Sequence, residues 1–349
     1  MITAAGEDSG AGSAGGREIV DVLSVVEACA AAGCLQRVVF DAADASLRRF
    51  GEVRDGEASS MPGAVTAAQI VADWDEEELL EPRVLVSQAQ LQVLWKPPGW
   101  SVSVDRDDFG TLPPDARRQD GGGAKLLHEW VIDELGAGHA IAQDAAVSHG
   151  LVHRIDRFTS GALLWASSYR GYYAARLRFA ARQVLKGYVC VCSGHLARAP
   201  QLLAAPLLEM APGSGLQRTV AAVGGRPACT EIRVVGHLMS PEKACASLVE
   251  VRLRTGRQHQ VRCHLAEAGH PLLGDAAYED GSRVEISAEV VRHWCPRVLL
   301  HACRLGLDLG DGPLDLEAPL PPDFRRALGQ LAAADGPARV LLQRWREHC

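Results

Sequence analysis

A strand, a tight turn and a helix follow one another in the last third of this 349-residue chain, and this succession constrains its fold more than any other feature. Apolar and charged side chains alternate strictly over residues 249–253, which predicts a strand with one buried face. Thr255 is a residue type that caps helices, and Gly256 permits a sharp turn. Apolar residues then recur at helical spacing over residues 261–268, until Gly269 ends the predicted helix.

The turn and the helix of this unit are rich in arginine and amide side chains. A helix N-terminus carries unsatisfied backbone N–H groups, and guanidinium forks match the oxygens of a phosphate. The unit therefore predicts a phosphate-binding position, with a solvated basic helix as the ordinary alternative for such a composition.

A second informative segment places one carboxylate between two arginines. Asp156 stands between Arg154 and Arg157, shortly before an apolar run at residues 162–166. Apolar surroundings disfavour the charged form of an acid, whereas neighbouring cations favour it. We therefore expect Asp156 to stay ionised and to be a candidate nucleophile, while a surface ion pair is the alternative that this segment alone leaves open.

Five blocks of sequence complete a pattern. In chain order they are KPPG at 96–99, HRIDRFTSG at 153–161, KGY at 186–188, TGRQHQVRCHLAEAGHPLLGDAAY at 255–278 and LHACRL at 300–305. Together they resemble the RluA-type pseudouridine synthases, a family that isomerises uridine in ribosomal and transfer RNA, over about residues 84–330. The departures at Ile155, Val261 and Leu272 are near-isosteric, whereas nothing in the sequence explains Phe158, where a polar residue is commoner.

The pattern of predicted strands and helices and the family resemblance predict the same fold class. From residue 84 onward, many short strands with interspersed helices indicate an α+β fold with a mixed, mostly antiparallel central sheet and flanking helices. The resemblance implies the pseudouridine synthase catalytic fold, with a cleft across the middle of the sheet. We expect an acidic, partly disordered and partly helical extension of no recognised family at 1–83, a catalytic domain at 84–330 and a C-terminal helix at 331–349.

Individual elements are also predicted along the chain. They are helices at 17–50, 126–135 and 168–186, strands at 91–95 and 230–235, a polar Gly-rich loop at 105–125, a hairpin around Gly310-Asp311-Gly312 and a helix that starts at 321–324.

The resemblance implies roles for three catalytic residues. Asp156 would be the nucleophilic carboxylate, acting on the sugar or on the base, and the sequence leaves both routes open. Arg262 would pair with Asp156, because a planar guanidinium fork matches a carboxylate. Tyr188 would lie against the uracil ring. Asp275 is expected to have a structural role and to tie down the helix that carries Arg262.

Four further residues are assigned to the substrate. The target uridine has to leave its stack, and Arg154 would fill the vacated space, as its counterpart in the family does. Arg257 would hold a phosphate near the helix N-terminus. His153 and Lys96 are expected to face the RNA or to belong to the scaffold.

Charge is unevenly distributed along the chain. The formal net charge is −7, but residues 1–85 hold sixteen acidic and six basic residues, a balance of −10 that leaves +3 for the remainder. Residues 151–190 carry seven basic residues against Asp156 alone, a local excess of +6. Such a basic region around a candidate active site is typical of a phosphate-bearing substrate, so the predicted partner is RNA, either rRNA or tRNA.

Other classes of function find less support in the sequence. There is no convincing metal-ligand spacing, no P-loop and no G-x-S-x-G element, so we expect no metal and no cofactor. Ten cysteines without a C-x-x-C motif, no run long enough to span a bilayer and no secretory signal favour a monomeric cytoplasmic or nuclear protein, with an organelle left open. The alternatives are a catalytically silent RNA-binding protein that retains the fold and an unrelated Asp-dependent hydrolase.

Overall fold

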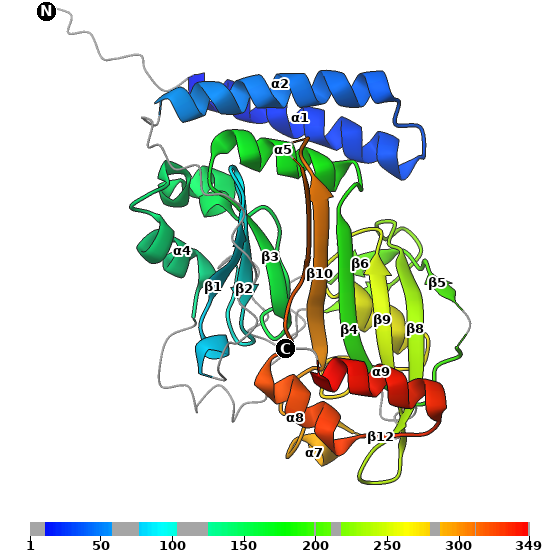
Figure 1. The fold of residues 1–349 in the computed structure, drawn as a ribbon. Coiled ribbons are helices and arrows are strands. Elements are labelled where there is room, and N and C mark those ends of the chain that lie inside the picture. Colours follow the sequence, from blue (N-terminus) through cyan, green and yellow to red (C-terminus); the bar gives the residue numbers. More distant parts are fainter. Residues whose placement is uncertain are drawn as a thin grey trace, which may run out of the picture.

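A large β-sheet forms the centre of the molecule, and helices lie at both ends of its strands (Figure 1). The computed structural model describes residues 11–57, 77–102, 125–198, 200–210, 218–279, 287–310 and 312–347. Within this part of the chain, the predicted α+β class with a mixed, mostly antiparallel sheet is confirmed.

Ten strands form the central sheet. Their bounds are β1 Arg83–Ser87, β2 Leu91–Lys96, β3 Ser160–Ala166, β4 Leu185–Ser193, β5 Gln201–Leu203, β8 Thr230–Met239, β9 Cys245–Leu253, β10 Leu300–Asp308, β11 Pro313–Glu317 and β12 Ala332–Ala333. They follow the order β1-β2-β3-β10-β4-β9-β8-β12, with β11 on β10 and β5 on β8. β6 (Leu207–Glu209) and β7 (Thr219–Ala221) form a separate antiparallel pair.

One pair in the sheet is parallel, that of β3 with β10, and the other pairs between the described strands are antiparallel. β3 is buried along its whole length, as expected for a strand covered on both faces. The end of β9 alternates between buried and half-buried residues over 249–253, so the strand predicted there is confirmed.

The helices are α1 Ala11–Ala31, α2 Arg37–Glu57, α4 Leu127–Leu135, α5 Tyr169–Ala180, α6 Gln260–Glu267, α7 Ala288–Val291, α8 Pro322–Gln330 and α9 Gly336–Glu347, with short 3-10 turns at Glu78–Leu80, Ala140–Gln143 and Ala145–Gly150. α1 and α2 lie against α5 at one end of the strands, and α8 and α9 lie at the other end (Figure 1).

The N-terminal hairpin of α1 and α2 is docked onto the rest of the molecule. Its core residues Val26 and Leu47 are 1% and 2% exposed and belong to the same cluster as the strands β2 and β3. The carboxylate of Asp55 accepts the backbone N–H groups of Tyr169 and Arg170 at 2.7 and 3.0 Å. Because the first N–H groups of a helix lack partners within it, Asp55 of α2 satisfies the N-terminus of α5.

Several predicted boundaries move. The helical region predicted over 17–50 consists of two helices, of which the first begins at Ala11. The chain reverses between them around Gly33, which has a φ of +70°. The helix predicted over 168–186 ends at Ala180, because Arg182 adopts the left-handed region and β4 starts at Leu185.

The helix after Gly256 also starts later than predicted. His259, with a φ of 52°, rather than Thr255, precedes the first turn of α6, which ends before Gly269 as expected. The predicted α4, the β10–β11 hairpin and the start of α8 are confirmed. Residues 105–124 of the predicted loop and residues 1–10 lie outside the described part of the chain.

Gly161 is predicted to be irreplaceable at the start of β3. Its φ is +124°, and a Cβ there would stand 2.2 Å from the Ala302 carbonyl oxygen of the parallel neighbour β10. Gly161→Ala should lower the free energy of unfolding by at least about 2 kcal/mol, measured by urea denaturation. Gly329→Ala is the matched control, because a Cβ at this helical position meets nothing within 4 Å and should change stability by at most about 1 kcal/mol. Equal effects of the two substitutions would contradict this account.

Candidate active site

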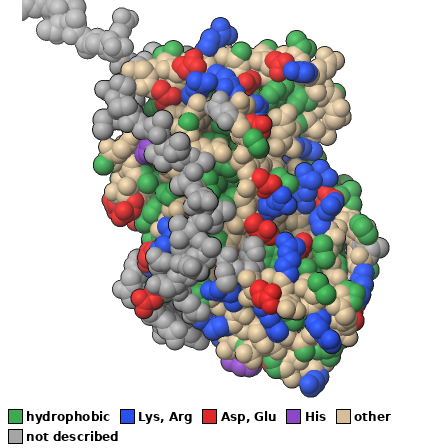
Figure 2. Space-filling model, viewed as in Figure 1, with side chains coloured by type: hydrophobic (Ala, Val, Ile, Leu, Met, Phe, Trp, Pro, Cys, Tyr) green, Lys and Arg blue, Asp and Glu red, His purple; other side chains and the backbone are tan. Residues whose placement is uncertain are grey.

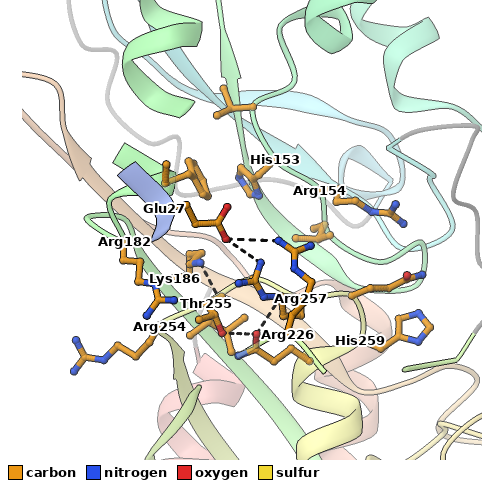
Figure 3. Close-up of a pocket in the computed structure, with 18 of the residues that line it drawn as sticks. Glu27, His153, Arg154, Arg182, Lys186, Arg226, Arg254, Thr255, Arg257 and His259 are labelled. Carbon is orange, nitrogen blue, oxygen red and sulfur yellow. Dashed lines mark hydrogen bonds and ion pairs between the residues drawn. The ribbon is translucent and has the colours of Figure 1, made fainter. Parts of the chain in front are cut away.

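A cleft of about 430 Å³ opens over the middle of the sheet, where β10, β4 and β9 are neighbours. Its walls come from residues 152–159, from the end of α5, from β4, from the turn at 253–261 and from α1 (Figure 3). The lining includes five of the seven predicted site residues, namely His153, Arg154, Asp156, Tyr188 and Arg257.

Asp156 lies in the extended segment that leads into β3, with a side chain that is 16% exposed. Its carboxylate Oδ2 stands 3.5 Å from Nη1 of Arg262 on α6, so the structure brings together these two residues that are distant in the sequence. The chain neighbour Arg157 is directed elsewhere, because its Nε donates to the Gly99 carbonyl at 3.0 Å. The cation beside the carboxylate is therefore Arg262, which the fold brings to it from α6.

Arg262 is held by a second acid. Its Nε and Nη2 donate to the two carboxylate oxygens of Asp275, each at 2.8 Å, and the guanidinium carbon lies 5.0 Å from the ring centre of Tyr278. The side chains of Arg262 and Asp275 are 5% and 2% exposed. A buried bidentate pair fixes the plane of the guanidinium, and this leaves Nη1 directed at Asp156. Asp275 thus ties down Arg262, as its place in the longest sequence block predicts.

The turn before α6 is fixed by one amide side chain. Gln260 Oε1 accepts from the hydroxyl of Thr255 at 2.7 Å and from the backbone N–H of Arg257 at 3.1 Å. Its Nε2 donates to the Cys229 carbonyl and to the Thr230 hydroxyl, each at 3.0 Å. Since both ends of this amide are engaged, the backbone that presents Arg257 to the cleft has a defined shape.

Tyr188 projects from β4 into the lining of the cleft and packs against two core clusters. Burial raises the pKa of its phenol well above the usual value, and the negative charge of Asp156 raises it further. The phenol is therefore neutral at physiological pH, and its ring offers a flat face within the cleft.

Basic side chains outnumber acidic ones around the cleft. The basic lining residues are Arg154, Arg176, Arg182, Lys186, Arg226, Arg254 and Arg257, against the acids Glu27, Asp156 and Glu209. Burial, followed by the charges of Arg257 and Arg182, lowers the pKa of Lys186 to about 8. Lys and Arg side chains also gather on the face shown in Figure 2, over the half of the sheet that holds β4, β9 and β8.

Two of the predicted substrate-binding residues are built into the scaffold. Lys96 is 0% exposed, and its ammonium donates to the carbonyls of Pro97, Trp100 and Arg157 at 2.9, 2.8 and 2.9 Å. His153 stacks on Phe179, and its Nε2 accepts a backbone N–H from β3. Burial and the nearby Lys186 charge lower the pKa of His153 to about 3, so the ring is neutral. The scaffold alternative therefore fits Lys96, while His153 combines a structural bond with a place in the cleft wall.

The arginines of the predicted basic region at 151–190 divide into two groups. Arg176 of α5 and Arg182, just after this helix, line the cleft. Arg170 and Arg178 instead pair with Glu52 and Asp44 of α2, at 3.5 and 3.6 Å. Lys186, which belongs to the same predicted basic region, also lines the cleft. The structure adds Arg226 and Glu27, which no local sequence pattern marks.

Two other features are absent from the described ranges. No group of three or more His, Cys, Asp or Glu residues there is arranged to hold a metal ion. In the same ranges, none of the helices is long and apolar enough to cross a membrane.

A match to a protein family model shows the family to which the chain belongs. The family model described as RNA pseudouridylate synthase matches residues 93–267, half of the chain, so the chain belongs to this family, and the resemblance seen in the sequence blocks is confirmed. The fold agrees with this result. The solved structure of human RNA pseudouridylate synthase domain containing 1 matches with a TM-score of 0.50 at 19% identity, covering 77% of this chain and 96% of that one.

The chain is also similar to curated proteins of bacteria. The chain is similar to the ribosomal large subunit pseudouridine synthase D of Nitrosomonas europaea, with 35% identity over 51% of this chain and 50% of the relative. It is also similar to the protein of the same name from Zymomonas mobilis, with 33% identity over 50% of this chain and 54% of the relative. The chain thus spans about half the length of the curated relatives it matches.

The clamp on Arg262 yields a stability prediction. Asp275→Asn should lower the free energy of unfolding by about 3 kcal/mol, because it leaves a buried guanidinium poorly compensated. The pair Arg304–Asp315 has the same bidentate geometry, with bonds of 2.9 and 2.6 Å, but its side chains are 50% and 48% exposed. Asp315→Asn should therefore cost less than about 1 kcal/mol in the same urea titration. A cost for Asp275→Asn no greater than that of the control would contradict the clamp.

Proposed function

We propose that this protein is an RNA pseudouridine synthase that isomerises specific uridines in structured RNA through an Asp nucleophile and base flipping. One observation carries the proposal. A partly exposed carboxylate, Asp156, stands beside the anchored guanidinium of Arg262 in a cleft that also presents the ring of Tyr188 and an excess of cations. Membership of the RNA pseudouridylate synthase family supports the same reaction.

The size and charge of the cleft suit a nucleotide. Small-molecule sites commonly measure about 300–1,000 Å³, and the cleft volume of about 430 Å³ falls within that range. A uridine inside an RNA stack cannot reach Asp156, so it has to be turned out at a cost of a few kcal/mol. Contacts between the lining cations and the RNA phosphates would offset that cost, and Arg154, which lines the cleft, would fill the space that the base vacates.

The reaction needs no redox partner or energy donor. The bond between the uracil N1 and C1′ breaks, the base turns, and a bond forms between C5 and C1′. C5 gives up its proton and N1 gains one, so the product is an isomer of uridine. Asp156 would attack the sugar or the base, while Arg262 keeps the carboxylate charged and aimed. Tyr188 would support the turning uracil through its ring, because its raised pKa makes the phenol a poor base at neutral pH.

The substrate class follows from the relatives and remains part of the proposal. The similar proteins from Nitrosomonas europaea and Zymomonas mobilis are named ribosomal large subunit pseudouridine synthases. This supports ribosomal RNA as the first substrate to test, with transfer RNA as the second.

Catalysis is tested by release of tritium from RNA that carries C5-labelled uridine. Asp156→Ala should remain folded, because the side chain makes a 3.5 Å contact that Arg262 can lose while it keeps Asp275. Release should fall by at least about 10³-fold, since the nucleophile is absent. Asp315→Asn, which removes a carboxylate from β11, should retain full release. Full activity of Asp156→Ala would overturn the mechanism, and no release by the unmodified protein would favour a catalytically silent RNA-binding protein.

RNA affinity should depend on pH through Lys186. Its pKa is lowered to about 8, so its charge is present at pH 7 and is lost as pH rises through 8. We expect the affinity for RNA to fall between pH 7 and 9, measured by fluorescence anisotropy at constant ionic strength. Lys186→Arg keeps the charge throughout this range and should flatten the profile. The same fall in Lys186→Arg would show that another group is responsible.

A further inference from the structure

Glu27 of α1 reaches into the cleft and bridges two arginines. Its Oε1 lies 3.1 Å from Nη1 of Arg257 and 3.7 Å from Nη2 of Arg226, and Figure 3 shows the carboxylate directed at both guanidinium groups. The Nε of Arg257 is in turn held by the Pro227 carbonyl at 3.1 Å. One oxygen between two guanidinium groups is the arrangement that Arg pairs offer to a phosphate oxygen.

The surroundings of this bridge are arranged for an anion. Lys186 and Arg182 line the same cleft, and the ammonium of Lys186 donates at 3.1 Å to the carbonyl of Thr255, two residues before Arg257. The side chains of Arg226 and Glu27 are 62% and 41% exposed, so an anion from solvent has access to them. With seven basic against three acidic lining residues, Glu27 neutralises a fraction of the local charge.

The helix that carries Glu27 is positioned independently of this contact. Val26 beside it is 1% exposed within the core, and α1 packs on both α2 and α5. Val20, Leu23 and Ser24 of the same helix also line the cleft. The docked hairpin therefore delivers the carboxylate to the two arginines and forms one wall of the site.

We propose that Arg226 and Arg257 form a binding position for an RNA phosphodiester in the cleft that Asp156 lines, and that Glu27 occupies this position until RNA displaces it. The inference rests on the proposed function, because it takes RNA as the ligand. A phosphodiester carries one negative charge, as the Glu27 carboxylate does. It can therefore replace the carboxylate between the two arginines without changing the local charge. Glu27 then competes with the RNA phosphate and lowers the affinity of the cleft for RNA, so RNA that makes few other contacts does not displace it.

The test compares two substitutions that each remove one negative charge from α1. Glu27→Gln removes the competitor, whereas Asp21→Asn neutralises an exposed residue of the same helix that is not among the lining residues. The probe is a fluorescein-labelled oligouridylate, and binding is followed by anisotropy over a range of salt concentrations. Glu27→Gln should tighten binding about three- to tenfold, and Asp21→Asn by less than about twofold. The binding of Glu27→Gln should also depend more steeply on salt, because the arginines then exchange counterions for phosphates.

A double-mutant cycle locates the effect. In an Arg226→Gln background, Glu27→Gln should tighten binding less than it does in the unmodified chain. Equal effects of Glu27→Gln and Asp21→Asn, weaker binding by Glu27→Gln, or full additivity with Arg226→Gln would each overturn the proposal. Because binding is measured without catalysis, loss of isomerase activity with intact RNA binding would sink the proposed reaction and leave this inference standing.

Discussion

The guanidinium of Arg262 is the contact on which the site depends. Asp275 takes two of its N–H groups in a buried bidentate pair, and the remaining nitrogen faces Asp156. A buried arginine needs a compensating charge, and a carboxylate that is to react needs a cation that does not move. Both needs are met by one side chain, because the Gln260 amide fixes the turn that starts at Thr255 and α6 carries Arg262 in its first turn. The β9–α6 connection is therefore the element that positions Arg262 beside Asp156.

The acidic N-terminal helices give a reason for the uneven charge of the chain. Asp55 accepts the first N–H groups of α5, Asp44 pairs with Arg178, and Glu27 bridges the arginines of the cleft. Part of the negative charge of residues 1–85 is thus directed at basic side chains elsewhere in the chain. A basic patch counted from sequence overstates the surface that is open to RNA, since α2 already engages part of it.

The sequence predicts the candidate site residues better than their surroundings. Asp156 and Arg262 occur in blocks whose order is readable, and the strand–turn–helix pattern places Arg262 on a helix. For Lys96 the sequence leaves the RNA and the scaffold open, and three carbonyl groups that accept from its ammonium decide for the scaffold. The bridge from Glu27 to Arg226 joins distant segments without a local pattern, so it depends on how the hairpin docks and is visible in three dimensions alone.

Uridine isomerisation by the carboxylate beside Arg262 is the central claim, and a map of pseudouridines in cellular RNA tests it most directly. The map is made for cells that carry the gene, for cells that lack it, and for cells complemented with the Asp156→Asn variant. The account predicts at least one uridine that loses its modification with the gene, regains it with the unmodified protein, and does not regain it with the variant. Restoration by the variant, or maps that are identical with and without the gene, would contradict it.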